Sequence, residues 1–247
     1  PPQIIESGKG DCANEILTLN RLAMALRKQR FAHGAIDFDR QEMKFVIDEK
    51  GRPISVYTKE SKEANKLIEE FMLLANRTVA ETIGRVPKNR TPKPFVYRVH
   101  DNPDPEKMAT LSEFVHRLGL KLKATGTRSE ITASINQLLT QVHNTPEENL
   151  ISTLTIRTMA KAVYTTENIG HYGLAFDYYT HFTSPIRRYP DMMVHRLLER
   201  YLDKGRAVDS EELEDRCKHS SDMEQIAANA ERASIKYKQA EFLSERL

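Results

Sequence analysis

The spacing of hydrophobic positions changes twice in the first 85 residues. Between residues 11 and 31 the apolar positions recur at alternating spacings of four and three, which predicts an amphipathic helix that Gly34 ends. From Ile36 to Val56 apolar and polar residues alternate, which predicts a small antiparallel meander. A second helical period, over residues 61–83, predicts a helix that is buried nearly all round. Its main apolar face comprises Ala64, Leu67, Ile68, Phe71 and Ala75.

The remainder of the chain is mostly helical in pattern. A Pro-rich, basic loop over residues 84–94 precedes a short strand, and Asp104 then caps a helix. Two more helices follow, and Thr145 begins a capping box for the second of them. Residues 170–189 have no helical period, and two further helices begin near residues 190 and 209. We therefore expect an α+β fold, helix-dominated, with several helices packed on a small antiparallel sheet.

Composition narrows the functional classes. The chain has 247 residues, 37 Lys and Arg, 35 Asp and Glu, and a net charge of +2, so any basic surface must be local. No apolar run approaches the length of about 20 residues that a membrane span needs, so we expect no membrane partner. Two distant cysteines and the lack of a leader segment favour a cytoplasmic location. The opening residues suggest that the chain begins partway through a longer protein.

Residues 170–189 are the chemical centre of the chain. Six of its 9 Phe and 9 Tyr residues fall here, interleaved with two histidines and with Arg187 and Arg188. This composition suits a site that stacks bases and holds phosphate. An aromatic core loop whose arginines pair with carboxylates explains the same pattern. His171 and His181 lack a nearby third ligand, so hydrogen bonding is a better explanation for them than a metal site.

The helix over residues 61–83 carries a polar cluster on the face away from its apolar stripe. Glu69, Glu70, Asn76 and Arg77 surround Leu73 there. One interpretation is an internal ion pair between one of the glutamates and Arg77. The other is a polar wall of a substrate channel.

Asp37 and Asp39 are a further pair of carboxylates that could bind a metal ion. They lie two apart on an expected strand and so share a face, as two ligands of a hard cation could. A solvated face of a hairpin is the better explanation, because the residues that follow are polar and turn-like. We therefore assign no metal ligand to this chain.

Residues 170–196 closely resemble the signature of the ribonuclease R and ribonuclease II (RNB) family. The match runs through GHYGLA at 170–175, YTHFTSPIRRYPD at 179–191, and His195 and Arg196. Further stretches at 30–38, 64–76, 97–100 and 157–159 agree, and the likeness is greater to ribonuclease R than to ribonuclease II.

The resemblance implies the activity of a longer protein. Members of the family are processive exoribonucleases that hydrolyse single-stranded RNA from its 3′ end to nucleoside 5′-monophosphates, with Mg²⁺ held by a cluster of aspartates. Residues 1–247 resemble only the C-terminal part of the catalytic domain, without the aspartate-cluster half or the OB-fold domains. The missing half of the catalytic domain is therefore an expected partner, together with RNA. Mg²⁺ belongs to the parent enzyme and is not bound by residues of this chain.

The resemblance also implies roles for single residues. Arg187 matches the family's arginine at the scissile phosphate. Glu70, or Glu69 if the alignment slips by one, matches a glutamate near the terminal ribose, and Glu231 resembles one along the RNA path. The expected wall residues of the substrate channel are Tyr179, His181, Thr183, Ser184 and Arg188.

Two functional hypotheses follow. In the first, the chain is a fragment of an RNB exoribonuclease that supplies phosphate and ribose contacts and is inactive when isolated. In the second, it is a non-catalytic RNA-binding module, in which the same groups hold RNA without cutting it.

Overall fold

The fold is helix-dominated, as predicted. The computed structural model describes residues 2–36, 42–59 and 62–244. Within these ranges the helices are α1 (Pro2–Ser7), α2 (Ala13–Ala32), α3 (Glu63–Gly84), α4 (Pro105–Arg117), α5 (Arg128–Val142), α6 (Glu148–Thr158), α7 (Tyr189–Leu202) and α8 (Ser210–Ser244). The strands are β1 (Glu42–Ile47), β2 (Pro53–Lys59), β3 (Tyr97–Val99) and β4 (Val163–Thr165), and a 3-10 helix, η1, spans Tyr172–Leu174. The short α1 was not expected from the apolar pattern.

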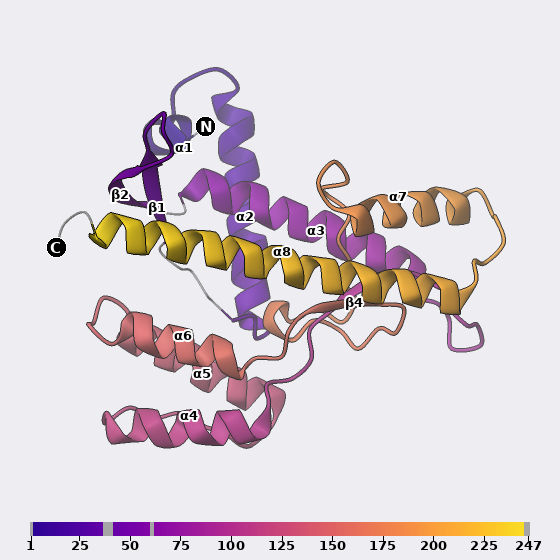
Figure 1. Cartoon of the computed structure of the whole chain (residues 1–247). Helices are drawn as coiled ribbons and strands as arrows, with labels where there is room; N and C mark the ends of the chain where they lie inside the picture. The colour runs from indigo at the N-terminus through magenta and orange to yellow at the C-terminus, as the bar shows by residue number, and fades with distance from the viewer. Residues whose placement is uncertain (1, 37–41, 60–61, 245–247) are drawn as a thin grey trace.

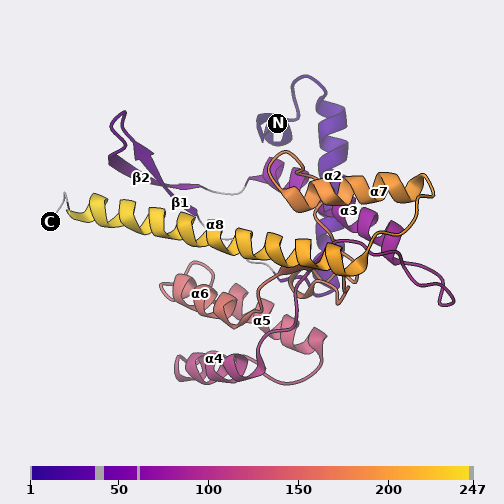
Figure 2. The same ribbon diagram turned by 45° about the vertical axis from the view of Figure 1, so that its right-hand side comes forward.

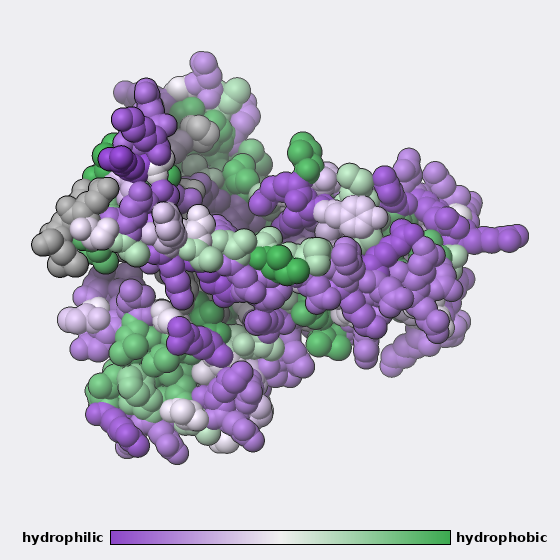
Figure 3. Space-filling model, viewed as in Figure 1, coloured by the Kyte–Doolittle hydropathy of each residue, from purple (hydrophilic) through white to green (hydrophobic). Residues whose placement is uncertain are grey.

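The long helix α8 runs across the molecule and separates two groups of helices. Helices α4, α5 and α6 lie on one side of α8, whereas α3 and α7 lie on the other, and α2 crosses behind α8 (Figures 1 and 2). The β1–β2 hairpin lies beside the C-terminal end of α8, where the Phe45 and Phe242 rings contact each other with centroids 5.9 Å apart. The face in Figure 3 is largely hydrophilic, with a hydrophobic area over α4–α6.

Each group of helices has its own core. One core joins α3, β3, β4, α7 and the first turns of α8, and it includes Phe95, Val194 and Cys217. The other joins α4, α5 and α6 around Val115, Ile135 and other fully buried aliphatic side chains. The 170–189 segment connects the two, because Tyr172 belongs to the second core and Tyr178 packs against the first.

The described residues form two small sheets, whereas the sequence predicted one. β1 pairs with β2, and β3 pairs with β4, both antiparallel. β4 is only three residues long, too short for an alternating pattern to reveal it. The expected first strand of the meander does not begin at Ile36, whose N–H instead donates to the Gly173 carbonyl. Residues 37–41, and with them Asp37 and Asp39, lie outside the described residues.

The helix N-termini confirm one predicted cap and correct another. The Asp104 carboxylate accepts the N–H groups of Glu106 and Lys107 at the start of α4, as predicted. The capping box expected at Thr145 is absent from α6, because the Thr145 hydroxyl donates to the Val142 carbonyl instead. The reciprocal arrangement lies at the start of α5, between Thr127 and Glu130.

The buried face of α3 differs from the predicted one. Ile68, assigned to the apolar stripe, is 58% exposed. The side buried most deeply carries Leu67, Glu70, Leu73, Asn76 and Ala80. Glu70 pairs with Arg30 on α2, and Asn76 accepts a hydrogen bond from the backbone of the 179–183 segment. These two polar side chains can be buried because they are paired or hydrogen-bonded, which the apolar pattern alone does not predict.

Candidate functional site

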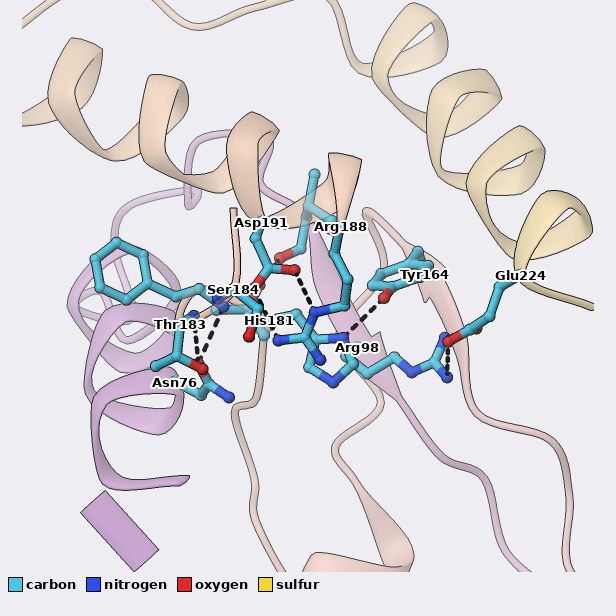
Figure 4. A network of polar contacts seen from close by, with 12 residues as sticks. Asn76, Arg98, Tyr164, His181, Thr183, Ser184, Arg188, Asp191 and Glu224 are labelled. Atoms are coloured by element: carbon cyan, nitrogen blue, oxygen red, sulfur yellow. Dashed lines mark hydrogen bonds and ion pairs between the residues drawn. The ribbon is translucent and has the colours of Figure 1, made fainter. Parts of the chain in front are cut away.

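Asn76 on α3 fixes the backbone of the segment that carries the candidate site. Its Oδ1 accepts the N–H groups of Phe182 at 3.0 Å and Thr183 at 3.2 Å (Figure 4). Its Nδ2 donates to the Tyr179 hydroxyl at 3.1 Å. Asn76 is 3% exposed, so these bonds form away from water. One buried amide therefore ties α3 to the start of the loop over residues 179–188, which we call the arginine loop.

The end of the arginine loop is fixed by a buried carboxylate. Asp191 has no solvent exposure, and its Oδ1 accepts the N–H of Ser184 and Nη2 of Arg188, both at 2.8 Å. Its Oδ2 lies 2.8 Å from Arg188 Nε. Asp191 is also in the first turn of α7, where the helix dipole favours negative charge. The guanidinium of Arg188 is thus held by Asp191.

Arg187 has the opposite environment. Its backbone N–H donates to the Ser184 carbonyl at 3.3 Å, which closes a turn in which Ile186 is fully exposed. The Arg187 side chain is exposed, and its guanidinium makes no hydrogen bond or ion pair with any of the described residues. Pairing of both arginines with carboxylates, the alternative left open by the sequence, holds for Arg188 and not for Arg187.

Arg187 lines a groove of about 850 Å³ between the arginine loop and α8, which we call the α8 groove. The loop side is lined by Arg187, Arg188, Tyr189 and Pro190, and Tyr164 of β4 lies with them. The α8 side is lined by Glu212, Asp215, Arg216, His219, Ser220, Met223, Glu224 and Ala227. These α8 positions recur at spacings of three and four, so they form one face of the helix. The groove combines cationic, aromatic and apolar side chains with three carboxylates of α8, those of Glu212, Asp215 and Glu224.

A second, smaller cavity lies on the other side of Arg188. This α3 pocket, about 350 Å³, is lined by Glu69, Asn76, Tyr179 and Arg188, together with apolar residues of α3. Glu69 has a side chain that is 49% exposed. One cavity therefore brings together residues from two separate predictions. Glu69 and Asn76 belong to the polar cluster predicted on the helix over residues 61–83, and Tyr179 and Arg188 belong to the expected wall of the substrate channel.

Glu70 is buried beside α2. Its carboxylate is paired with the Arg30 guanidinium and lies 3.6 Å from Nη1 of Arg27. The predicted partner, Arg77, instead pairs with Glu81 at 3.0 Å. The correction has a simple cause, because α2 packs across α3 and brings its arginines to the face that carries Glu70. Glu70 lines a separate cavity of about 240 Å³, not the α3 pocket.

His181 links the arginine loop to β4. Its Nδ1 lies 2.7 Å from the Tyr164 hydroxyl, and burial lowers the pKa of His181 to about 2. Burial likewise lowers the pKa of His171 to about 3. Both rings are therefore neutral at physiological pH and supply no positive charge to a ligand. This agrees with the hydrogen-bonding interpretation of the two histidines.

The remaining candidates lie in different settings. The Thr183 hydroxyl is buried and has no hydrogen-bond partner among the described residues, while the Ser184 N–H is bound by Asp191. Glu231 is exposed on α8, four residues beyond Ala227, the last groove residue on that helix. Of the predicted site residues, those that line the α8 groove or the α3 pocket are Glu69, Tyr179, Arg187 and Arg188. Those that line neither of these two cavities are Glu70, His181, Thr183, Ser184 and Glu231.

The described residues contain no group of three or more His, Cys, Asp or Glu side chains that could hold a metal ion. The residues present in these ranges do not fit a Mg²⁺ site of the family's kind. In the same ranges, no helix is both long and apolar enough to cross a membrane.

Three residues that position this site were missed by the sequence analysis. The sequence places Asp191 in the family signature, near the start of a helix, and it indicates no separate role for Asp191, Arg98 or Tyr164. The proline and acidic residue at the start of α7 gave a local signal for Asp191, since a carboxylate in a first helical turn often serves the preceding loop. Arg98 and Tyr164 act across strands that are distant in sequence, so no local pattern indicates them.

Comparison with known proteins identifies the family. The profile of the RNB domain matches residues 3–204, which is most of the chain. The chain belongs to the RNB domain family. The RNB match includes the whole arginine loop and α7, and with them every loop residue assigned above.

Curated RNB relatives include ribonuclease R of Aquifex aeolicus, 41% identical over 234 residues, and ribonuclease R of Thermotoga maritima, 38% identical over 231 residues. These alignments cover 93% and 90% of this chain and 32% of each relative. Among solved structures, Mycoplasma genitalium RNase R in complex with ribose methylated single-stranded RNA superposes with a TM-score of 0.85 at 29% identity. That match covers 100% of this chain and 39% of the other. The chain thus spans about a third of the length of the relatives it matches.

Proposed function

We propose that this chain is the C-terminal part of the catalytic domain of a 3′-to-5′ processive exoribonuclease. In this proposal the parent enzyme hydrolyses single-stranded RNA to nucleoside 5′-monophosphates, and residues 1–247 supply contacts to the scissile phosphate and to the terminal ribose. Membership of the RNB family and the ribonuclease R relatives support it. The observation that carries it is the contrast between two neighbouring arginines. Arg188 is paired with Asp191, whereas Arg187 lines the α8 groove and has no hydrogen-bond or ion-pair partner among the described residues.

Arg187 is suited to the charge that hydrolysis creates. A planar guanidinium can donate to two phosphate oxygens at once, and a lysine cannot match this geometry. The Arg188–Asp191 pair and the Asn76 bonds hold the arginine loop in place before any ligand binds. Arg187 can therefore stabilise charge on the phosphorus centre with little reorganisation of its backbone.

Glu69 is the better placed of the two candidate ribose-contacting glutamates. Its side chain is half exposed and lines the α3 pocket with Tyr179 and Arg188. Both glutamates contact the same arginines, since Glu69 Oε1 lies 3.5 Å from Nη2 of Arg30 and 3.9 Å from Nη1 of Arg27. Glu70 is the buried one of the two: it is 2% exposed, it is paired with the Arg30 guanidinium, and it lies 3.6 Å from Arg27. We assign hydrogen bonding to the ribose hydroxyls to Glu69 and a structural role to Glu70.

The metal-dependent part of the reaction belongs to the rest of the parent enzyme. Divalent cations activate water and stabilise the leaving oxygen in hydrolyses of this class. In the proposal, the aspartates that hold them lie in the half of the catalytic domain that this chain does not match. The isolated chain should then bind single-stranded RNA and fail to hydrolyse it.

The experiment compares the parent enzyme with the isolated chain on the same single-stranded RNA, labelled uniformly along its length. We expect the parent to release nucleoside 5′-monophosphates in the presence of Mg²⁺ and to be blocked by a 3′-phosphate. The isolated chain should shift the RNA in a binding assay and release no mononucleotide. A parent that binds RNA but never cuts it would favour the second hypothesis, a non-catalytic RNA-binding module.

A further inference from the structure

One face of α8 is fastened to the β3–β4 sheet by a series of polar contacts. The Glu214 carboxylate accepts the Thr166 N–H at 2.6 Å and the hydroxyls of Thr165 and Thr166. Two turns later the Ser221 hydroxyl accepts the Tyr164 N–H at 2.9 Å. These contacts hold the first half of α8 at a fixed distance from β4.

The last contact of the series is the pair between Arg98 of β3 and Glu224. Nη1 and Nη2 of Arg98 lie 2.6 and 3.0 Å from the two carboxylate oxygens, so the pair is two-pronged (Figure 4). In the described part of the chain, the next hydrogen bond from α8 to another element is that of Lys238 to the Gly51 carbonyl, almost four turns further on. Arg98 thus marks the point beyond which α8 leaves the sheet.

Arg98 is itself held in place by aromatic rings. Its guanidinium carbon lies 4.5 Å from the centroid of the Tyr164 ring, a cation–π contact. Tyr164 is bonded through its hydroxyl to His181 of the arginine loop. Only 12% of the Arg98 side chain is exposed, compared with 43% of Glu224. A continuous path of contacts therefore runs from the arginine loop through Tyr164 and Arg98 to α8.

Glu224 belongs to two surfaces at once. It bonds Arg98 on the sheet side of α8, and it also lines the α8 groove opposite Arg187. The contact therefore fixes a residue of the groove wall that lies opposite the arginine loop. The same contact also neutralises a carboxylate that otherwise faces the phosphate path.

We propose that Arg98 is a positioning residue, which sets the width of the α8 groove through its pair with Glu224 and so places α8 opposite Arg187. The inference rests on the proposed function, because the ligand that it assigns to the α8 groove is an RNA phosphate bound by Arg187. It distinguishes two contributions of Glu224, its negative charge in the groove and its two-pronged contact with Arg98, and a variant can test them separately.

The decisive variant is Glu224→Gln, with Glu241→Gln as the matched control. Glu241 pairs with Lys238 on the same helix, away from the groove. Loss of the Glu224 charge removes repulsion of phosphate, so RNA affinity of the parent enzyme should stay within threefold of wild type or increase. Loss of the two-pronged contact should lower the single-turnover rate at saturating RNA by on the order of tenfold. Arg98→Lys, which keeps the charge and loses the fork, should show a similar fall in rate.

A distance measurement tests the geometry without relying on activity. Spin labels at Ile186→Cys and Met223→Cys span the α8 groove, in a background with the exposed Cys12 changed to Ser; Cys217 is buried and does not interfere. We expect a narrow distance distribution in the parent enzyme and in Glu241→Gln, and a broader one in Glu224→Gln and Arg98→Lys.

The outcomes separate the two proposals. An unchanged distance distribution in Glu224→Gln overturns the positioning role, whether or not the rate falls, because a fall would then reflect direct action of Glu224. A broadened distribution with a wild-type rate overturns it as well. A wild-type parent that does not hydrolyse RNA overturns the proposed function alone, since the width of the groove is still measured by the labels.

Discussion

Asp191 holds Arg188 by two contacts of 2.8 Å, and the preceding residue, Arg187, has no partner among the described side chains. Two neighbouring arginines thus serve different purposes. The buried pair makes the turn rigid, and the turn presents the exposed guanidinium to the α8 groove. Rigidity is useful here because a preorganised donor loses less entropy when it binds phosphate.

Arg187 should contribute to the rate and little to RNA affinity. In the parent enzyme, Arg187→Ala and Arg187→Lys should each lower turnover by about a hundredfold or more, as loss of about 3 kcal/mol of transition-state stabilisation implies. RNA affinity should change by less than about tenfold, because many nucleotides share ground-state binding. Single-turnover rates and equilibrium binding measure both quantities. Arg117→Ala on α4 is the control, and a variant of Arg187 that loses binding but keeps its bound-state rate would contradict the assignment.

Asp191 should contribute chiefly to stability. Asp191→Ala leaves Arg188 without its partner and the Ser184 N–H without an acceptor, so the free energy of unfolding should fall by about 3–5 kcal/mol. Asp191→Asn keeps an acceptor for Ser184 and should cost less. Urea denaturation of the chain followed by circular dichroism checks both values. Equal, small losses would show that the pair does not hold the loop.

Substitution of Glu70 should lower stability, whereas substitution of Glu69 should lower the rate of hydrolysis. Glu70→Gln removes the charge that Arg30 and Arg27 surround, and should destabilise the chain by about 3 kcal/mol or more. Glu69→Gln should alter stability by less than about 1 kcal/mol, because its side chain is half exposed. In the parent enzyme Glu69→Gln should lower the rate, with a smaller effect on a substrate that has a 3′-terminal deoxyribose. If Glu70→Gln instead lowered the rate in this substrate-dependent way and Glu69→Gln did not, the ribose contact would be assigned to Glu70.

The buried histidines should make stability depend on pH. In the folded chain the pKa of His181 is about 2 and that of His171 is about 3, both below the value of about 6.5 in the unfolded chain. Each neutral histidine therefore makes its full contribution to the free energy of unfolding above about pH 6.5. This contribution decreases as the pH falls from there towards the folded pKa, because only the unfolded state binds the proton. Between pH 6 and 5 each histidine should lower the free energy of unfolding by roughly 1 kcal/mol. Denaturant unfolding at both pH values measures this slope, and His181→Gln should reduce it.

The β1–β2 hairpin should make the isolated chain self-associate. Ile47, Ile54 and Tyr57 are each about half exposed there, and an uncovered edge strand can pair with another chain. Size-exclusion chromatography with light scattering should show a mass that increases with concentration. Ile54→Ser with Tyr57→Ser should reduce this effect. A chain that stays monomeric at high concentration would rule out the hairpin as an exposed contact surface.

The sequence predicted most of the helices because their caps and periods are local. Asp104 and the pattern around α7 and α8 are examples, and the family signature at 170–196 marked the arginine loop. The partner of Glu70 could not be predicted in this way. Arg30 lies 40 positions away, and its approach depends on how α2 crosses α3. The roles of Asn76 and Arg98 likewise depend on contacts between elements that no spacing along the chain records.

The presence of two separate cores has a consequence for how the molecule opens. The α4–α6 core shares few of its buried side chains with the core beneath the arginine loop. Each core can therefore behave as its own cooperative unit in native-state hydrogen exchange, with its amides exchanging together. Opening of α4–α6 then leaves Asn76, Asp191 and the arginine loop in place, so local unfolding on one side of α8 does not disrupt the side that carries the α8 groove.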